Sequence, residues 1–350
     1  MEPDQKSSLA FTTVEETLDH PGFLSTFWDL EPDLKGRAPV GQSRGPVVNI
    51  AYEVHGAGPI KLVLIMGLAG VKNGWQRQTK YFGHTHPDKY SVLILDNRGV
   101  GESDKPLRRY STSDMALDVI ELLDHLGWTA DRDIHLAGIS LGGMIAQEVA
   151  ARIPRRLQSL SLLSTSALFE SEASATLAGR ISHRLGFLRL RSEDDAIADT
   201  ARKLFTDDFL AEPEDPAQLP GPGTHKCRGE YLPFASNFQR FQAQELAKRR
   251  IPGYWSLGGF LCQLLAAGWH RKSPEQLRDM ADQVGRDRIL VMHGTRDSMI
   301  ELPNGEKLIK WIEPRVGLIV EGMGHVPIME RPDWFHGVFE DHIAACSKLV

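Results

Sequence analysis

The chain contains 350 residues, of which 41% are hydrophobic and 25% are charged, and its formal net charge is −6. This composition is ordinary for a globular enzyme, and the length fits one α/β domain with an insertion better than two independent domains. The excess of acidic residues and the lack of a basic stripe argue against a general nucleic-acid binder.

The segment 1–45 differs from the rest of the chain because it contains repeated prolines and no sustained hydrophobic period. It is predicted to be an extension that lies on the surface or is partly disordered. It shows neither a secretory signal nor an arginine-rich transit peptide. Three scattered cysteines without a C-x-x-C pair favour a reducing compartment, so we expect a cytoplasmic protein.

From residue 47 onward, short apolar runs alternate with helical patterns. Alternating or continuous apolar runs predict strands, and apolar residues at helical spacing predict helices. In chain order, we expect strands at 47–55, 61–67 and 90–96, and helices at 73–84 and 111–126. Because strands and helices alternate in this way, the sheet is predicted to be mostly parallel and doubly wound.

The stretch 136–144 reads LAGISLGGM and places Ser140 between an apolar run and a helical pattern. A sharp turn from strand to helix strains the central residue and leaves no room for side chains two residues before and after it. Gly138 and Gly142 meet that requirement, although G-x-S-x-G also occurs by chance. The turn would expose the Ser140 hydroxyl as a nucleophile and place the Leu141 N–H at a helix N-terminus, where it can stabilise an oxyanion.

Beyond the Ser140 helix the pattern changes twice. After one more apolar run, several helical patterns and a proline-rich loop follow without a strand of comparable quality, and strands then resume. The late strands are expected at 287–294 and 316–322, before a closing helix at 331–346. The predicted divisions are a first core half at 46–165, an inserted helical region at 166–285 and a second core half at 286–350.

Asp297 and His325 each follow one of the two late strands. The carboxyl ends of parallel strands meet at one edge of a sheet, which would bring both residues close to Ser140. A histidine within hydrogen-bond reach can take the proton of a serine hydroxyl, and an aspartate can hold the imidazole in the required tautomer. Asp96 also follows a strand, but Asp297 is the better candidate for the acid.

These motifs resemble the α/β-hydrolase fold superfamily, whose serine hydrolases carry a nucleophile elbow followed by the acid and then the histidine. The resemblance implies a mostly parallel sheet and a helical cap, formed here by 166–285, over the nucleophile. It also implies that the loop after the second strand supplies the second oxyanion donor, the Leu68 N–H. Met66 stands where the superfamily commonly has histidine, but a backbone donor does not depend on that side chain.

The run D-x-R-G-x-G-x-S, at 96–103, is similar to a superfamily signature that shapes the floor of the cavity. The resemblance therefore implies structural roles for Asp96, Arg98 and Ser103. We expect a buried ion pair between Asp96 and Arg98 to order this loop.

Within the predicted cap, residues 254–269 are apolar almost all round. This run is shorter than the ~20 residues that a membrane span needs and contains two adjacent glycines, so we expect no integral membrane segment. It is interpreted as a buried cap helix, or alternatively as a surface that lines the pocket or touches lipid. Near a hydrophobic substrate we expect the side chains of Met66, Trp255, Phe260 and Trp269.

The predicted function is a serine hydrolase that cleaves a carboxylic ester, lactone or thioester of a small hydrophobic substrate through an acyl-serine intermediate. The triad chemistry needs neither a metal nor an organic cofactor, and His84 and His86 lack the nearby carboxylates or cysteines that would complete a metal site. The stretch GISLGGMIAQEVA resembles enol-lactonases and C–C bond hydrolases, so C–C cleavage on the same triad is one alternative. Acyl transfer or cyclisation, and ligand binding without turnover, are others. Neither the substrate nor the oligomeric state can be read from these residues.

Overall fold

The computed structural model describes residues 11–168 and 191–349. Its centre is an eight-stranded sheet in the spatial order β10-β9-β7-β6-β4-β5-β3-β2. Strand β3 runs antiparallel to both of its neighbours, and the other pairings are parallel. The strands of this sheet are β2 (Leu34–Val40), β3 (Val48–His55), β4 (Ile60–Ile65), β5 (Tyr90–Leu95), β6 (Ile134–Ile139), β7 (Leu157–Leu163), β9 (Ile289–Gly294) and β10 (Val316–Val320).

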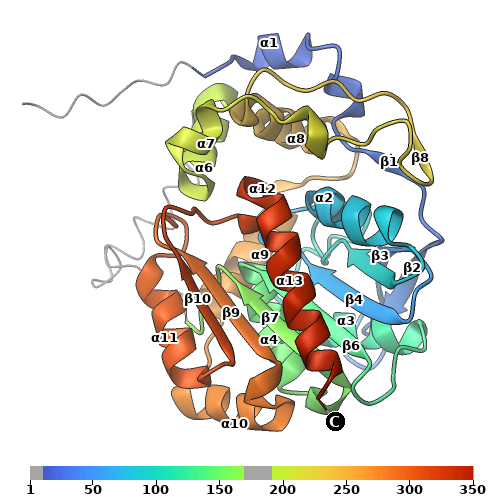
Figure 1. Ribbon diagram of the computed structural model, residues 1–350, viewed down its shortest axis with the longest axis vertical. Helices are drawn as coiled ribbons and strands as arrows, with labels where there is room; N and C mark the ends of the chain where they lie inside the picture. The colour runs from blue at the N-terminus through green and yellow to red at the C-terminus, as the bar shows by residue number, and fades with distance from the viewer. Residues whose placement is uncertain (1–10, 169–190, 350) are drawn as a thin grey trace, which may run out of the picture.

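Helices cover both faces of the sheet (Figure 1) and enclose one apolar cluster on each face. The central strands β6 and β7 are buried along their whole length, as expected for strands covered on both sides. On one face lie α3 (Thr112–His125), α4 (Leu141–Ala150), α10 (Pro274–Val284) and α11 (Leu302–Ile312). On the other lie α13 (Pro332–Ser347) and the helical turns from Lys72 to Thr85, which include α2 (Gln76–Gln78). The predicted fold class is therefore confirmed.

A helical insertion leaves the sheet layer after β7 and returns before α10. An antiparallel bridge between Leu168 and Arg271 joins the two chain segments at the base of this insertion. The described cap helices are α6 (Glu193–Leu204), α7 (Asp207–Ala211), α8 (Asn237–Arg250) and α9 (Leu257–Trp269). The predicted cap extended to residue 285, but α10 packs against α4, α11 and β7 and belongs to the sheet layers.

The N-terminal segment takes part in both the sheet and the cap, which differs from the predicted surface extension. Residues 34–40 form the edge strand β2, and Pro39 is tolerated there because an edge strand needs fewer N–H donors. Helix α1 (Val14–Leu18) packs across α8 at the top of Figure 1. The short strand β1 (Asp29–Leu30) pairs with β8 (Cys227–Arg228) of the cap region. Residues 1–10 lie outside the described part of the chain.

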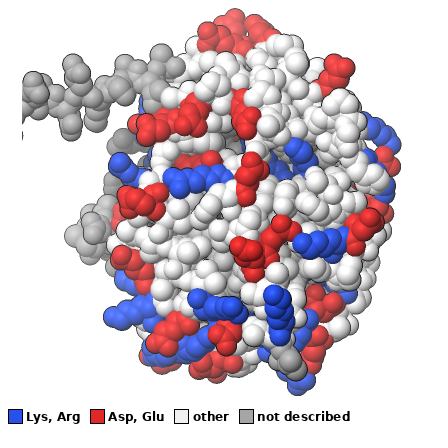
Figure 2. Space-filling model, in the orientation of Figure 1, with Lys and Arg blue, Asp and Glu red and all other residues white. Residues whose placement is uncertain are grey.

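Acidic and basic side chains are interspersed over the face shown in Figure 2, without a continuous basic stripe on that face. No helix among the described residues is both long and apolar enough to cross a membrane. Within 11–168 and 191–349, no three potential ligand side chains gather in a way that would hold a metal ion. His84, discounted above as a ligand, instead contacts His55 Nδ1 at 2.9 Å.

Several histidines are buried in the folded protein, and burial lowers their pKa well below the usual value of 6.5. The pKa falls to about 3 for His135 and to about 4 for His84, His270, His336 and His342. These side chains are therefore neutral in the folded protein at pH values where the unfolded chain begins to bind protons.

The free energy of unfolding is expected to decrease as the pH falls from about 6.5 towards 4, because the unfolded chain binds protons more readily than the folded protein. Each histidine contributes a slope of up to about 1.4 kcal/mol per pH unit in this window. Urea unfolding between pH 7.5 and 4.5 measures the total slope. His135→Asn should reduce the slope by the contribution of one histidine, up to about 1.4 kcal/mol per pH unit, whatever the absolute stability of the variant. Identical slopes for the wild-type protein and His135→Asn would contradict the prediction.

Candidate active site

Ser140 is the residue at which β6 turns into α4, and its backbone is strained as the glycine pattern predicts. Its φ of 56° and ψ of −122° are rare for a residue with a side chain. A Cβ atom on Gly138 would lie 2.2 Å from the Gly142 carbonyl oxygen, and one on Gly142 would lie 2.1 Å from the Ile65 oxygen. Only glycine fits at these two positions: the turn itself requires Gly138, and the close approach of β4 requires Gly142.

His325 and Asp297 lie on the loops after β10 and β9 and are joined by a hydrogen bond. His325 Nδ1 lies 2.7 Å from Asp297 Oδ2, and both side chains are buried. The other carboxylate oxygen of Asp297 accepts the backbone N–H groups of Met299 at 2.9 Å and Ile300 at 2.8 Å. The carboxylate is therefore fixed, and the contact at Nδ1 leaves Nε2 of His325 as the nitrogen available to a substrate or a nucleophile.

His293 is a second histidine beside Asp297, and it was not among the predicted site residues. Its Nε2 lies 2.7 Å from the Ile300 carbonyl oxygen and 3.3 Å from Asp297 Oδ2. A carbonyl only accepts, so Nε2 must carry the proton and also donates towards the carboxylate. Burial lowers the pKa of His293, which keeps the ring neutral. Because His293 lies within the apolar run of β9, no sign of its contact with Asp297 is visible in the sequence.

The loop after β4 approaches the serine turn closely. It is closed by a hydrogen bond from the Gly70 N–H to the Gly67 carbonyl at 3.2 Å. A Cβ atom on Gly67 would lie only 3.1 Å from the Ser140 Cβ, so the two backbones nearly touch. Leu68, the next residue of this loop, and Leu141, the first residue of α4, both line the cavity at the serine. An N–H at the first position of a helix has no acceptor within the helix and is available to a ligand.

A cavity of about 460 Å³ lies between the sheet and the cap, and both Ser140 and His325 line it. Within the described part of the chain their side chains are not hydrogen-bonded to each other. Such contacts are often loose in a protein without substrate and tighten in the complex. The structure thus brings Ser140 and His325 to one cavity, with Asp297 directly behind the imidazole.

Three of the four side chains predicted to lie near a substrate line this cavity, namely Met66, Trp255 and Phe260. Trp269 does not line it: its side chain is 60% exposed and lies under the Arg109 guanidinium at 4.1 Å. It lies on the outer side of α9 because a helix that is apolar all round presents only part of its surface to the cavity. Charged side chains at the same cavity include Lys203, Glu245, Lys248 and Arg249.

The predicted Asp96–Arg98 ion pair is wrong, because each residue has another partner. Asp96 accepts the backbone N–H of Lys72 at 2.7 Å and lies 3.3 Å from its ammonium nitrogen. Arg98 instead pairs with Asp118 of α3. Both pairs are buried, and they join the loop after β5 to Lys72 on one side and to α3 on the other. Ser103 lies on the same loop, and its hydroxyl donates to the Asp96 carbonyl at 2.6 Å.

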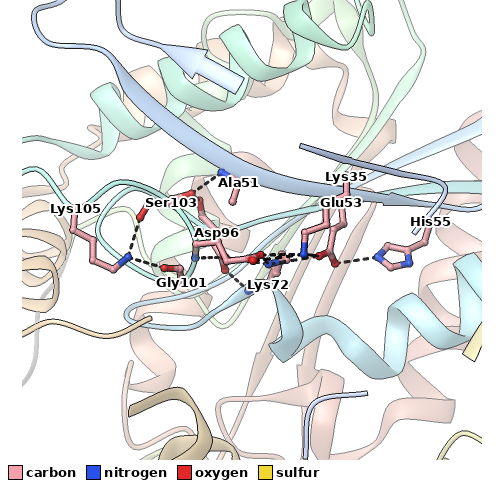
Figure 3. A network of polar contacts seen from close by, with 10 residues as sticks. Lys35, Ala51, Glu53, His55, Lys72, Asp96, Gly101, Ser103 and Lys105 are labelled. Carbon is pink, nitrogen blue, oxygen red and sulfur yellow. Dashed lines mark hydrogen bonds and ion pairs between the residues drawn. The ribbon is translucent and has the colours of Figure 1, made fainter. Parts of the chain in front are cut away.

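Lys72 lies between several carboxylates in a buried network that Figure 3 shows. Burial alone would lower the pKa of Lys72, but the charges of Asp96, Glu53 and Glu102 outweigh it and raise the pKa. Burial likewise opposes ionisation of Glu53, yet its hydrogen bond with His55 and the charge of Lys72 lower its pKa to about 2. Lys72 is therefore held as a cation at the end of the loop that carries Leu68.

Comparisons with known proteins agree with this fold. The family model described as the alpha/beta hydrolase fold matches residues 61–332. The chain is 27% identical over 268 residues to 3-oxoadipate enol-lactonase 2 of Acinetobacter baylyi, covering 76% of this chain and 82% of that protein. It is 36% identical over 132 residues to the dihydrolipoyllysine-residue acetyltransferase component of the acetoin cleaving system of Pseudomonas putida; this match covers 37% of the chain and 34% of that protein.

A thermophilic esterase from Thermogutta terrifontis superimposes with a TM-score of 0.65 at 19% identity, over 89% of this chain and 99% of that one. At this identity the likeness supports the fold and says nothing of the substrate. The family match covers most of the chain, including both the serine turn and the histidine loop. The chain therefore belongs to the α/β-hydrolase fold family.

Proposed function

We propose that this protein is a serine hydrolase that cleaves a carboxylic ester, lactone or thioester of a small hydrophobic substrate. The observation that carries the proposal is the meeting of the strained Ser140 turn and the His325–Asp297 hydrogen bond at one cavity. The volume of this cavity, about 460 Å³, is in the range of small-molecule sites.

In the proposed reaction, His325 Nε2 takes the proton of the Ser140 hydroxyl as its oxygen attacks the carbonyl carbon. The oxygen of the tetrahedral intermediate accepts the N–H groups of Leu68 and Leu141. His325 then gives its proton to the leaving group, and an acyl-serine forms. Water, activated by the same imidazole, attacks this ester and restores the hydroxyl. Asp297 stabilises the imidazolium throughout, and neither a metal nor a cofactor enters these steps.

Acyl transfer is a second candidate because one relative is named as an acetyltransferase component. In that case an alcohol, thiol or amine replaces water in the second half of the reaction. Cleavage of a C–C bond next to a carbonyl would use the same triad. These alternatives share the acyl-enzyme or its tetrahedral precursor and differ in the bond that breaks or in the acceptor.

A fluorophosphonate probe, which phosphonylates activated serines, tests the proposal directly. We expect intact mass spectrometry to find one adduct on the wild-type protein and none on Ser140→Ala. A panel of aryl esters, lactones and β-diketones, with and without an added alcohol acceptor, then separates the candidate reactions by their products. Folded wild-type protein that neither reacts with the probe nor turns over any substrate would refute the proposal and favour ligand binding without turnover.

A further inference from the structure

The loop that carries Leu68 is held in place by the cap. Its Ala69 has a φ of 55°, a left-handed conformation that costs energy for a residue with a side chain. Both backbone groups of Ala69 are bound by cap side chains. The Ala69 N–H donates to Gln263 Oε1 of α9 at 2.8 Å, and its carbonyl accepts Lys248 Nζ of α8 at 3.1 Å. These contacts stabilise a backbone conformation that is otherwise unfavourable.

Gln263 joins this loop to a second loop of the site. Its Nε2 donates to the Arg98 carbonyl at 2.8 Å, so one amide bridges the loops after β4 and β5. Gln263 is fully buried and is the one amide side chain in an otherwise apolar helix. A buried amide is costly unless its donors and acceptors are satisfied, and here the partners are two backbone groups rather than other side chains.

Gln263 does not line the cavity, whereas Phe260, Leu264 and Ala267 of the same helix do. The contact of α9 with the loop after β5 is also close: a Cβ atom on Gly259 would lie 2.0 Å from the Gly99 carbonyl oxygen. The helix therefore has little freedom to shift relative to the loop that contains Arg98 and Gly99. Phe260 and Leu264 face the cavity, while the amide of the same helix contacts the backbone next to Leu68.

We propose that Gln263 is a positioning residue, which sets the orientation of the Leu68 N–H through Ala69 without contacting the substrate. This inference rests on the proposed function, because it gives the Leu68 N–H its role in binding the oxyanion. The geometry of the oxyanion site then depends on the position of the cap helix that lines the cavity. Preorganised donors matter most in the transition state, so the loss of Gln263 should appear in kcat rather than in KM.

Gln263→Met removes both amide hydrogen bonds at similar volume, and Gln263→Glu keeps the acceptor for the Ala69 N–H. We expect Gln263→Met to lower kcat for an aryl ester and the rate of fluorophosphonate labelling by about 10- to 100-fold, with KM within roughly 3-fold of wild type. Gln263→Glu should recover part of this loss. The matched control is Gln158→Met, which removes a buried glutamine amide that donates to the Cys346 carbonyl. It should leave kcat and labelling unchanged.

Wild-type kcat and labelling in folded Gln263→Met would overturn the inference, as would an increase in KM at unchanged kcat. If Gln263→Met does not fold, Lys248→Met removes the other contact to Ala69 and should also lower the rate of fluorophosphonate labelling. An unchanged labelling rate in Lys248→Met would overturn the inference as well. Failure of the proposed function is distinguishable, because the wild-type protein itself would then neither react nor turn over.

Discussion

Ser140→Ala is expected to lower kcat for ester hydrolysis by about 10⁶-fold, because it removes the proposed nucleophile and little else. The structural contacts of residue 140 are made by its backbone: the N–H donates to the Leu163 carbonyl at 2.9 Å, and the carbonyl accepts the Thr165 hydroxyl at 2.7 Å. Alanine keeps both contacts. Steady-state hydrolysis of a chromogenic ester and thermal unfolding, measured on both proteins, check the prediction.

The matched control is Ser161→Ala. Ser161 is fully buried on β7, and its hydroxyl has no partner within the described residues. Its removal should leave kcat at the wild-type value. A Ser140→Ala protein that keeps more than about 1% of the wild-type kcat would contradict the assignment of the nucleophile.

Asp297→Asn is expected to lower kcat by about 10⁴-fold through the tautomer of His325. The N–H groups of Met299 and Ile300 both donate to one oxygen of this side chain, and they would select the carbonyl oxygen of asparagine. The amide NH₂ would then face His325 Nδ1 in place of a carboxylate oxygen. Because two donors repel, Nδ1 would lose its hydrogen and Nε2 would carry it, so the imidazole could no longer accept the proton of Ser140.

This prediction is checked by kcat with the same ester and by the rate of fluorophosphonate labelling, both of which should fall. Asp282→Asn changes an exposed carboxylate that pairs with Arg286 and should leave both rates unchanged. If kcat of Asp297→Asn stays within about tenfold of wild type, the carboxylate does not control the imidazole as proposed.

A local pattern was sufficient to predict the serine turn, because both required glycines flank Ser140 within five consecutive residues. Glycine at 138 is required by the backbone of the turn itself, whereas glycine at 142 is required by the close approach of the end of β4. The apolar runs of β4, β6, β7 and β9 were equally readable, since strands buried on both faces carry continuous hydrophobic sequence. With the apolar run of β10 added to these strands, the placement of Ser140, Asp297 and His325 after the carboxyl ends of β6, β9 and β10 could be inferred.

Pairings between distant residues could not be predicted. Residues 34–40 read as loop because an edge strand with alternating burial and a proline has little hydrophobic signal, yet they pair with β3 along their whole length. A carboxylate in sequence does not reveal its cation: Asp96 was expected to pair with Arg98, two residues away, and instead pairs with Lys72. Gln263 stands out in the sequence only as one amide in an apolar run. Its two hydrogen-bond partners, the Ala69 N–H and the Arg98 carbonyl, lie on loops far away in sequence.

The bridge between Leu168 and Arg271 means that the inserted region departs from the core and rejoins it at a single stem. Such a region can be lengthened, shortened or exchanged in evolution without altering the register of any central strand. If Gln263 positions the Leu68 N–H as proposed, an insertion of another sequence must supply its own hydrogen-bond acceptor for the Ala69 N–H at the place that Gln263 occupies.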